Sequence, residues 1–218
     1  MEIIVNNITL NYIKQGSGKP LIVLHGNGED LHIFDKLIEK LEKQYTVYAI
    51  DSRNHGNSTR TEDYSYETMV EDIHRFIEQL KLRHVSIIGF SDGAIISLML
   101  ALKQPHIFEK MILLGVNLKP TDFKIEVYDS LIEDYEKTKD PLLKMMLEHP
   151  NIELDELKNI TIPTLVIGAE NDLFESKSFE KIADKIPNAI LKIMKGYDHG
   201  NYVIGNSVLY PYLKEFLQ

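Results

Sequence analysis

The chain has 218 residues, of which 44% are hydrophobic and 26% charged, and these values suit one globular domain. Its formal net charge of −9 argues against non-specific nucleic-acid binding, which depends on lysine and arginine, and weakens the case for anionic membrane surfaces. There is no cysteine, which excludes disulfides, thiolate metal sites and thiol nucleophiles.

The first half of the chain predicts an antiparallel start followed by alternating strands and helices. Residues 2–14 form a hairpin pattern with Asn6 and Asn7 at the turn. Pro20 begins an apolar run that is typical of a strand buried on both faces. The periodicity then predicts, in order, strand 21–24, helix 31–41, strand 46–50, helix 66–80 with Ser65 as its N-cap, strand 85–89, helix 92–103 and strand 111–116.

The second half resumes this alternation after an interruption between residues 118 and 162. The elements expected there are strand 164–168, helix 176–186, strand 190–194 and helix 206–217. Regular alternation predicts right-handed crossovers and therefore an α/β fold, a three-layer α/β/α sandwich with a mostly parallel sheet. Its core domain would consist of residues 1–117 and 163–218.

The interruption at 118–162 predicts a small helical cap or lid. Two helical patterns replace the strands, one with Phe123, Val127, Leu131 and Tyr135 on a face and the other running from Leu142 to Leu147. An insertion that follows a strand end lies where ligands bind in open α/β sheets. The alternative is that these helices only cover the edge of the sheet.

A serine between two glycines marks the change from strand 85–89 to the next helix. In Gly89-Phe90-Ser91-Asp92-Gly93 the glycines let the strand and the helix pack closely around Ser91. A G-x-S-x-G sequence in this context is the nucleophile elbow of the α/β-hydrolase architecture. Asp92 could itself be a nucleophile, but Ser91 fits the glycine spacing better.

A serine nucleophile needs a histidine base and an acid, which follow it in that order in this architecture. His199 is the only histidine C-terminal of residue 149, and it comes just after strand 190–194. Asp172 follows strand 164–168 and is favoured as the acid by its offset from the strand. Glu170, Glu175 and Asp198 are the other candidates, although Asp198 adjoins His199 and neighbouring side chains diverge.

The oxyanion hole is expected from two backbone amides, those of Asn27 and Asp92. The segment His25-Gly26-Asn27-Gly28 follows the first buried strand, from which this architecture supplies one donor. The helix that starts at Asp92 adds the positive end of its dipole. His25 is interpreted as a structural residue that orients the loop.

Taken together, these motifs resemble the α/β-hydrolase fold family, in particular its small-cap esterases, lactonases and C–C hydrolases. The resemblance covers nearly the whole chain: HGNG at 25–28, DSRNHGNS at 51–58, GFSDG at 89–93, IPTLVIGAEND at 162–172 and DHG at 198–200. In the second motif Asn54 stands where glycine is usual, and asparagine tolerates a positive φ. Asp51, Arg53 and His55 are interpreted as braces of that loop.

We therefore expect a carboxylesterase-like serine hydrolase with Ser91, His199 and Asp172 as its triad and an acyl-enzyme intermediate. Phe90, Phe123, Met145 and Met146 are candidates for the acyl pocket, with ordinary core packing as the alternative. No metal or organic cofactor motif is present. The expected binding partner is a small-molecule substrate, in the first place a small neutral ester, while thioesters, lactones and C–C substrates are left open. A homodimer is also left open.

A second class of function has to be considered, because the same fold also serves as a ligand receptor or supports non-hydrolytic chemistry. A receptor would bind its ligand without appreciable turnover. The N-terminal segment shows no signal-peptide pattern, and no apolar run is long enough to span a bilayer, so a cytoplasmic location is expected.

Overall fold

The fold begins with the predicted hairpin, and the computed structural model describes residues 1–218 throughout. β1 (Glu2–Val5) pairs antiparallel with β2 (Ile8–Gly16). Asn6 and Asn7 at the turn have φ angles of 47° and 61°, as a tight two-residue turn requires. β2 pairs antiparallel with β4 (Tyr45–Ile50), so the hairpin forms one edge of the sheet.

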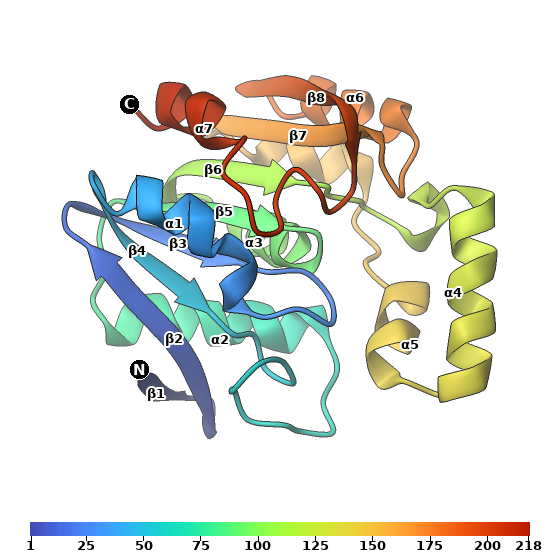
Figure 1. Cartoon of the computed structure of the whole chain (residues 1–218), viewed down its shortest axis with the longest axis horizontal. Coiled ribbons are helices and arrows are strands. Elements are labelled where there is room, and N and C mark those ends of the chain that lie inside the picture. Colours follow the sequence, from blue (N-terminus) through green and yellow to red (C-terminus); the bar gives the residue numbers. More distant parts are fainter.

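The remaining strands are parallel and complete an eight-stranded sheet in the order β1-β2-β4-β3-β5-β6-β7-β8 (Figure 1). They are β3 (Lys19–Leu24), β5 (Val85–Phe90), β6 (Phe108–Leu114), β7 (Thr164–Asn171) and β8 (Ala189–Asp198). Every residue of β5 is buried, because helices cover both faces of the central strands. The predicted α/β class and mostly parallel sheet are confirmed.

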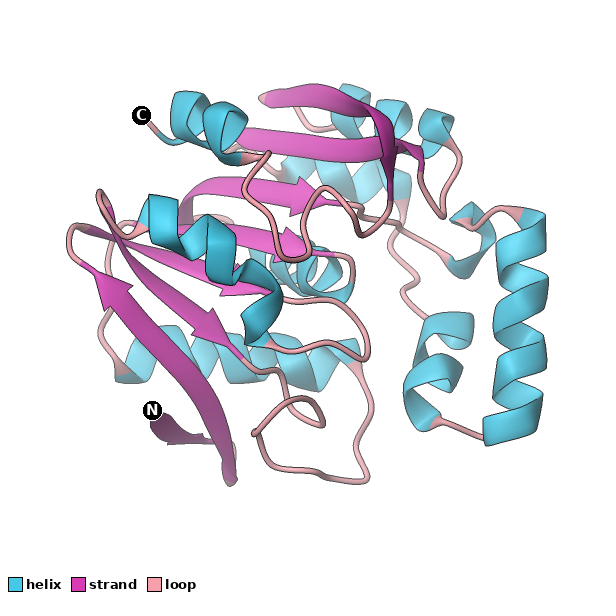
Figure 2. Ribbon diagram, in the orientation of Figure 1, coloured by secondary structure: helices cyan, strands magenta, loops and turns pink.

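Helices form a layer on each face of the sheet, as Figure 2 shows. One face carries α1 (Asp35–Leu41), which follows the 3-10 helix η1 (Leu31–Phe34), together with α7 (Tyr210–Leu217). The other face carries α2 (Tyr66–Gln79), α3 (Asp92–Lys103) and α6 (Ser176–Lys185). Ser65 is the predicted N-cap of α2, and its Oγ accepts from the Thr68 amide at 3.3 Å.

Residues between β6 and β7 form a helical excursion beside the sheet. It contains η2 (Pro120–Asp122), α4 (Ile125–Thr138), α5 (Pro141–Glu148) and η3 (Leu154–Asn159). In Figure 1, α4 and α5 stand apart from the sheet at the right of the view. α4 buries no residue, and α5 buries only Met145. Phe123 precedes α4 instead of lying on it, and it forms an isolated bridge with Phe174.

Several element ends differ from the predictions for reasons visible in the backbone. β8 continues to Asp198 instead of ending at 194, because Asn171 of β7 still pairs with Asp198 beyond a bulge. α7 begins at Tyr210 instead of 206, since residues 199–205 and 208–209 form turns and residues 206–207 have no regular structure. β6 ends at Leu114, where Gly115 turns the chain with a φ of 59°. None of the helices combines the length and apolar character needed to traverse a bilayer.

Candidate active site

Ser91 occupies a strained turn between β5 and α3. Its φ of 51° and ψ of −115° are unusual for a residue with a side chain. A Cβ on Gly89 would lie 2.2 Å from the Gly93 carbonyl oxygen, and one on Gly93 would lie 2.2 Å from the Leu24 carbonyl oxygen. Both glycines are therefore required by close backbone approach, as the elbow motif predicts. The Ser91 amide donates to the Leu114 oxygen at 2.8 Å, which holds the turn against β6.

The structure brings His199 and Asp172 to this serine. His199 directly follows β8 and Asp172 directly follows β7, so both lie at the carboxyl edge of the sheet. Ser91 Oγ is 3.1 Å from His199 Nε2, and His199 Nδ1 is 2.6 Å from Asp172 Oδ1. Since a carboxylate only accepts hydrogen bonds, Nδ1 carries the proton and Nε2 of the neutral ring is left to accept from the serine.

Of the other acids considered from the sequence, Glu175 is exposed, and Asp198 and Glu170 have partners other than His199. Asp198 accepts from the backbone amides of Gly200 and Asn201 and thus stabilises a turn. Glu170 accepts from the Gly196 amide, which ties β7 to β8. The alternative nucleophile Asp92 bonds to Tyr66 and Asn27, as described below, and makes no hydrogen bond with His199.

Backbone amides hold Asp172 in place. Its Oδ2 accepts from the Ala169 amide at 2.9 Å and its Oδ1 from the Leu173 amide at 2.8 Å. The side chain of Asp172 is completely buried and that of His199 is 13% exposed. The ring of Phe174 meets the imidazole edge-on with centroids 5.5 Å apart. A fixed carboxylate in a dry setting keeps the imidazole in one tautomer and one orientation.

Phe90 packs against the imidazole of His199, and the buried Tyr202 packs against Phe90. The Phe90 ring lies 4.9 Å from that of His199 and 6.4 Å from that of Tyr202, measured between centroids. The Tyr202 hydroxyl is buried without a hydrogen-bond partner. Burial and the charge of Asp172 raise the pKa of Tyr202 well above its usual value, so this hydroxyl stays neutral.

The proposed oxyanion donors lie next to Ser91. The amide of Asp92 is in the first turn of α3, where an N–H has no partner in its own helix. The Asn27 amide makes no hydrogen bond within the chain. The Gly93 amide donates to the His25 oxygen at 3.0 Å, which joins the loop of Asn27 to the start of α3. Both amides are thus free to bind a ligand atom.

His25 orients this loop as a neutral imidazole. Its Nε2 accepts from the Ser52 amide at 3.0 Å, and its Nδ1 donates to the Gly26 oxygen at 2.7 Å. Burial, with a smaller contribution from His55, lowers the pKa of His25 to about 4. The ring therefore remains neutral at physiological pH, in agreement with a structural role.

The side chain of Asp92 is a second buried carboxylate at the site. Oδ1 accepts from the Tyr66 hydroxyl at 2.7 Å and Oδ2 from Asn27 Nδ2 at 2.9 Å. Asn27 Nδ2 also lies 3.4 Å from the Leu142 oxygen of α5. Burial raises the pKa of Asp92, whereas its two hydrogen bonds oppose that change. Burial likewise raises the pKa of Glu29, whose Oε2 accepts from the Gly26 amide.

A very small cavity opens beside Ser91. The space that the centre of a water molecule can reach there is about 10 Å³, which is roughly the room of one water. Of the predicted acyl-pocket residues, Phe123 and Met146 line it, whereas Phe90 packs behind His199 and Met145 is in the core. Sequence reasoning missed four lining residues: Tyr66, Asn117, His149 and Phe174. Only their position in helices or loops near the strand ends could have indicated them.

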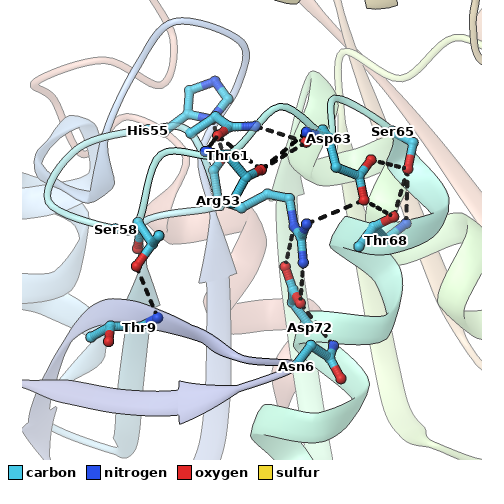
Figure 3. A network of polar contacts seen from close by, with 12 residues as sticks. Asn6, Thr9, Arg53, His55, Ser58, Thr61, Asp63, Ser65, Thr68 and Asp72 are labelled. Carbon is cyan, nitrogen blue, oxygen red and sulfur yellow. Dashed lines mark hydrogen bonds and ion pairs between the residues drawn. The ribbon is translucent and has the colours of Figure 1, made fainter.

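The loop 51–63 is braced by a buried ion pair, which Figure 3 shows. Arg53 donates from Nε and Nη2 to the two oxygens of Asp72 at 2.6 and 2.8 Å, and Asn6 adds a third donor to that carboxylate. Asn54 takes the positive φ that its place in the motif requires, at 65°. His55 is buried, and its Nε2 has no hydrogen-bond partner.

A family model described as the alpha/beta hydrolase fold matches residues 19–140 of the chain. The chain belongs to the α/β-hydrolase fold family. As a member of this family it is 28% identical to ethanol acetyltransferase 1 of Kluyveromyces lactis over 92% of its length, but it spans only 46% of that protein. It is 24% identical to a putative esterase/lipase of Haemophilus influenzae, covering 97% of this chain and 88% of that one.

Solved α/β-hydrolase structures have the same fold. The structure of Est816, described as an N-acyl homoserine lactone degrading enzyme, superimposes with a TM-score of 0.83 at 20% identity, over 99% of this chain and all of that one. The family and fold predicted from the sequence are therefore confirmed, and relatives named as hydrolases, an esterase/lipase and acetyltransferases agree with an enzyme. No group of three or more acidic or histidine side chains is gathered as around a metal ion.

Proposed function

We propose that the protein is a serine hydrolase that cleaves small carboxylic esters or related acyl compounds. The observation that carries this proposal is the continuous hydrogen-bonded line from Ser91 through His199 to Asp172, with spacings of 3.1 and 2.6 Å. A serine hydroxyl beside the unprotonated nitrogen of an oriented imidazole is the arrangement that nucleophilic acyl transfer needs.

In the proposed reaction Ser91 Oγ attacks the substrate carbonyl carbon while His199 Nε2 takes its proton. The carbonyl oxygen becomes an anion, which the amides of Asn27 and Asp92 bind. His199, now positive and stabilised by Asp172, gives its proton to the departing alcohol, and an acyl-serine remains. A water then attacks the acyl carbon with His199 as base, so that the acid leaves and Ser91 regains its proton.

We further propose that residues 118–162 act as a cap that limits the acyl group. Phe123 and Met146 from this segment, with Phe174, form the apolar wall of the cavity at Ser91. Because the cavity is so small, a short acyl chain such as acetyl is favoured over a long one unless the cap moves. Lys124 donates to the Asp172 carbonyl oxygen at 2.7 Å and so ties the base of the cap to the acid loop.

The test is hydrolysis of a p-nitrophenyl ester series from short to medium chain length. We expect activity in the wild type and its loss in Ser91→Ala, whereas Ser178→Ala on α6, a serine away from this site, keeps the wild-type rate. A fluorophosphonate label located by mass spectrometry should lie on Ser91. Equal rates for wild type and Ser91→Ala, or a label on another residue, would refute the proposal and leave a ligand-binding protein as the alternative.

Acyl transfer to an alcohol is a second candidate. It is favoured by the small size of the cavity, which leaves little room for bulk water, and by the similarity to an ethanol acetyltransferase over 92% of this chain. Adding ethanol to the ester assay would decide between acceptors. Formation of ethyl ester at the expense of free acid would support transfer, and unchanged acid release would exclude it.

A further inference from the structure

The two residues proposed to supply the oxyanion amides are also joined to each other through their side chains. Asn27 Nδ2 lies 2.9 Å from Asp92 Oδ2, although the residues are 65 positions apart in the chain. The bond links the loop after β3 to the first turn of α3. The side-chain contact therefore joins the same two residues whose backbone amides are proposed to bind the oxyanion.

The atoms of this contact have only one consistent assignment. A carboxylate oxygen accepts only, so the amide nitrogen of Asn27 must face Asp92. The two hydrogens of that nitrogen then have two acceptors, Asp92 Oδ2 and the more distant Leu142 oxygen. The Tyr66 hydroxyl donates to the other carboxylate oxygen. Both carboxylate oxygens of Asp92 therefore accept a hydrogen bond, one from Tyr66 on α2 and one from Asn27 in the loop after β3.

From this geometry we infer that Tyr66, Asp92 and Asn27 form a side-chain clamp that positions the two oxyanion-hole amides. The clamp residues act through their neighbours: their side chains set where the backbone N–H groups of Asn27 and Asp92 point. The backbone hydrogen bond from Gly93 to His25 holds the loop two residues before Asn27, whereas the exposed Gly28 on the other side of Asn27 lets the Asn27 amide reorient when the clamp is absent. The inference rests on the proposed acyl-transfer function.

Preorganised donors act on the transition state and not on the bound ester, which gives the clamp a distinct kinetic signature. In Asn27→Ala both backbone amides remain, but the side-chain hydrogen bond that restrains the distance between them is lost. Since misplacement by about 1 Å costs up to about 100-fold in rate, we expect kcat to fall about 10- to 100-fold with KM changed less than about threefold. Tyr66→Phe should act in the same direction and less strongly.

An alkyl boronic acid gives a direct readout of the oxyanion hole, because its tetrahedral adduct with a serine imitates the transition state. Its inhibition constant should rise in Asn27→Ala by about the same factor as kcat falls. Asn188→Ala is the matched control, since Asn188 is exposed and its Nδ2 also donates to one backbone oxygen, that of Thr161 at 2.7 Å. Both kcat and boronate affinity should be unchanged there.

Asn27→Asp provides a second readout that a general loss of packing would not produce. It places two carboxyl groups at the contact, which stay together only when they share a proton. The ratio of variant to wild-type kcat/KM should therefore rise as the pH is lowered.

Two outcomes would overturn the inference. One is an Asn27→Ala enzyme with kcat and boronate affinity within about twofold of wild type, and the other is an Asn27→Asp ratio that does not vary with pH. In either case Ser91-dependent hydrolysis would persist in the wild type. A failure of the proposed function would differ, because the wild type itself would then show no hydrolysis and no fluorophosphonate label at Ser91.

Discussion

Replacing Gly115 by alanine should impair catalysis by displacing His199. Gly115 follows β6, and a Cβ built on it lies 2.6 Å from His199 Cε1 and 2.9 Å from His199 Nδ1. Ordinary van der Waals contacts of a Cβ atom begin near 3.4 Å. The imidazole must therefore move away from residue 115 by the difference between 3.4 and 2.6 Å, roughly 0.8 Å. A displacement of that size costs up to about 100-fold in rate, or about 3 kcal/mol of transition-state stabilisation. The φ of 59° adds about 1 kcal/mol of strain to the fold.

The measurement is kcat/KM for p-nitrophenyl acetate together with the rate of fluorophosphonate labelling, and thermal unfolding reports the strain separately. Gly205→Ala is the matched control, because its φ is 65° and a Cβ there meets nothing within 4 Å. The control should lose a similar amount of stability and keep wild-type kinetics. If Gly115→Ala hydrolysed the ester within about threefold of wild type, the imidazole would not need the position described here, and the reasoning would fail.

Three further predictions concern stability and acyl selectivity. His25 has a pKa of about 4 in the fold against a reference of 6.5, so the unfolded chain takes up a proton at a higher pH than the folded chain does. The contribution of His25 to the free energy of unfolding, about 3 kcal/mol, is therefore complete above pH 6.5 and is lost between pH 6.5 and about 4. Urea unfolding should show a flatter pH dependence in His25→Asn. Arg53→Ala leaves the buried Asp72 charge without its partner and should cost about 3–5 kcal/mol in the same assay, whereas Lys36→Ala, which removes an exposed ion pair, should cost less than about 1 kcal/mol. Met146→Ala enlarges the cavity at Ser91 and should raise kcat/KM for hexanoyl relative to acetyl p-nitrophenyl ester, and an unchanged chain-length profile would contradict its place in the acyl wall.

The sequence was sufficient for the sheet and for the meeting of three distant side chains because these depend on strong local signals. The apolar run that starts at Pro20, the glycines around Ser91 and the polar residues after the last two strands each identify a strand and the residue that follows it. Parallel strands place their carboxyl ends on one edge, so the convergence follows from topology. A φ of 65° at Asn54 was also compatible with its residue type.

Features that depend on packing between distant segments could not be predicted. The extension of β8 to Asp198 arises from pairing beyond a bulge, which no periodicity in 190–198 indicates. Phe90 looked like a pocket residue from its place beside Ser91, but alternation along the strand turns it toward Tyr202. The hydrogen bond from Asn27 to Asp92 needs the loop and the helix to be placed to within an ångström.

The order of strands has a consequence for the way the protein is made. Ser91 lies near the middle of the sheet, but its partner His199 comes 108 residues later, after the outermost strand, β8. In the proposed reaction His199 is the base for Ser91, so a nascent chain that has been made only as far as β7 would hold a serine with the reactivity of an ordinary alcohol. On the proposed mechanism the nucleophile therefore becomes reactive only after β8 has joined the sheet and brought His199 to Ser91.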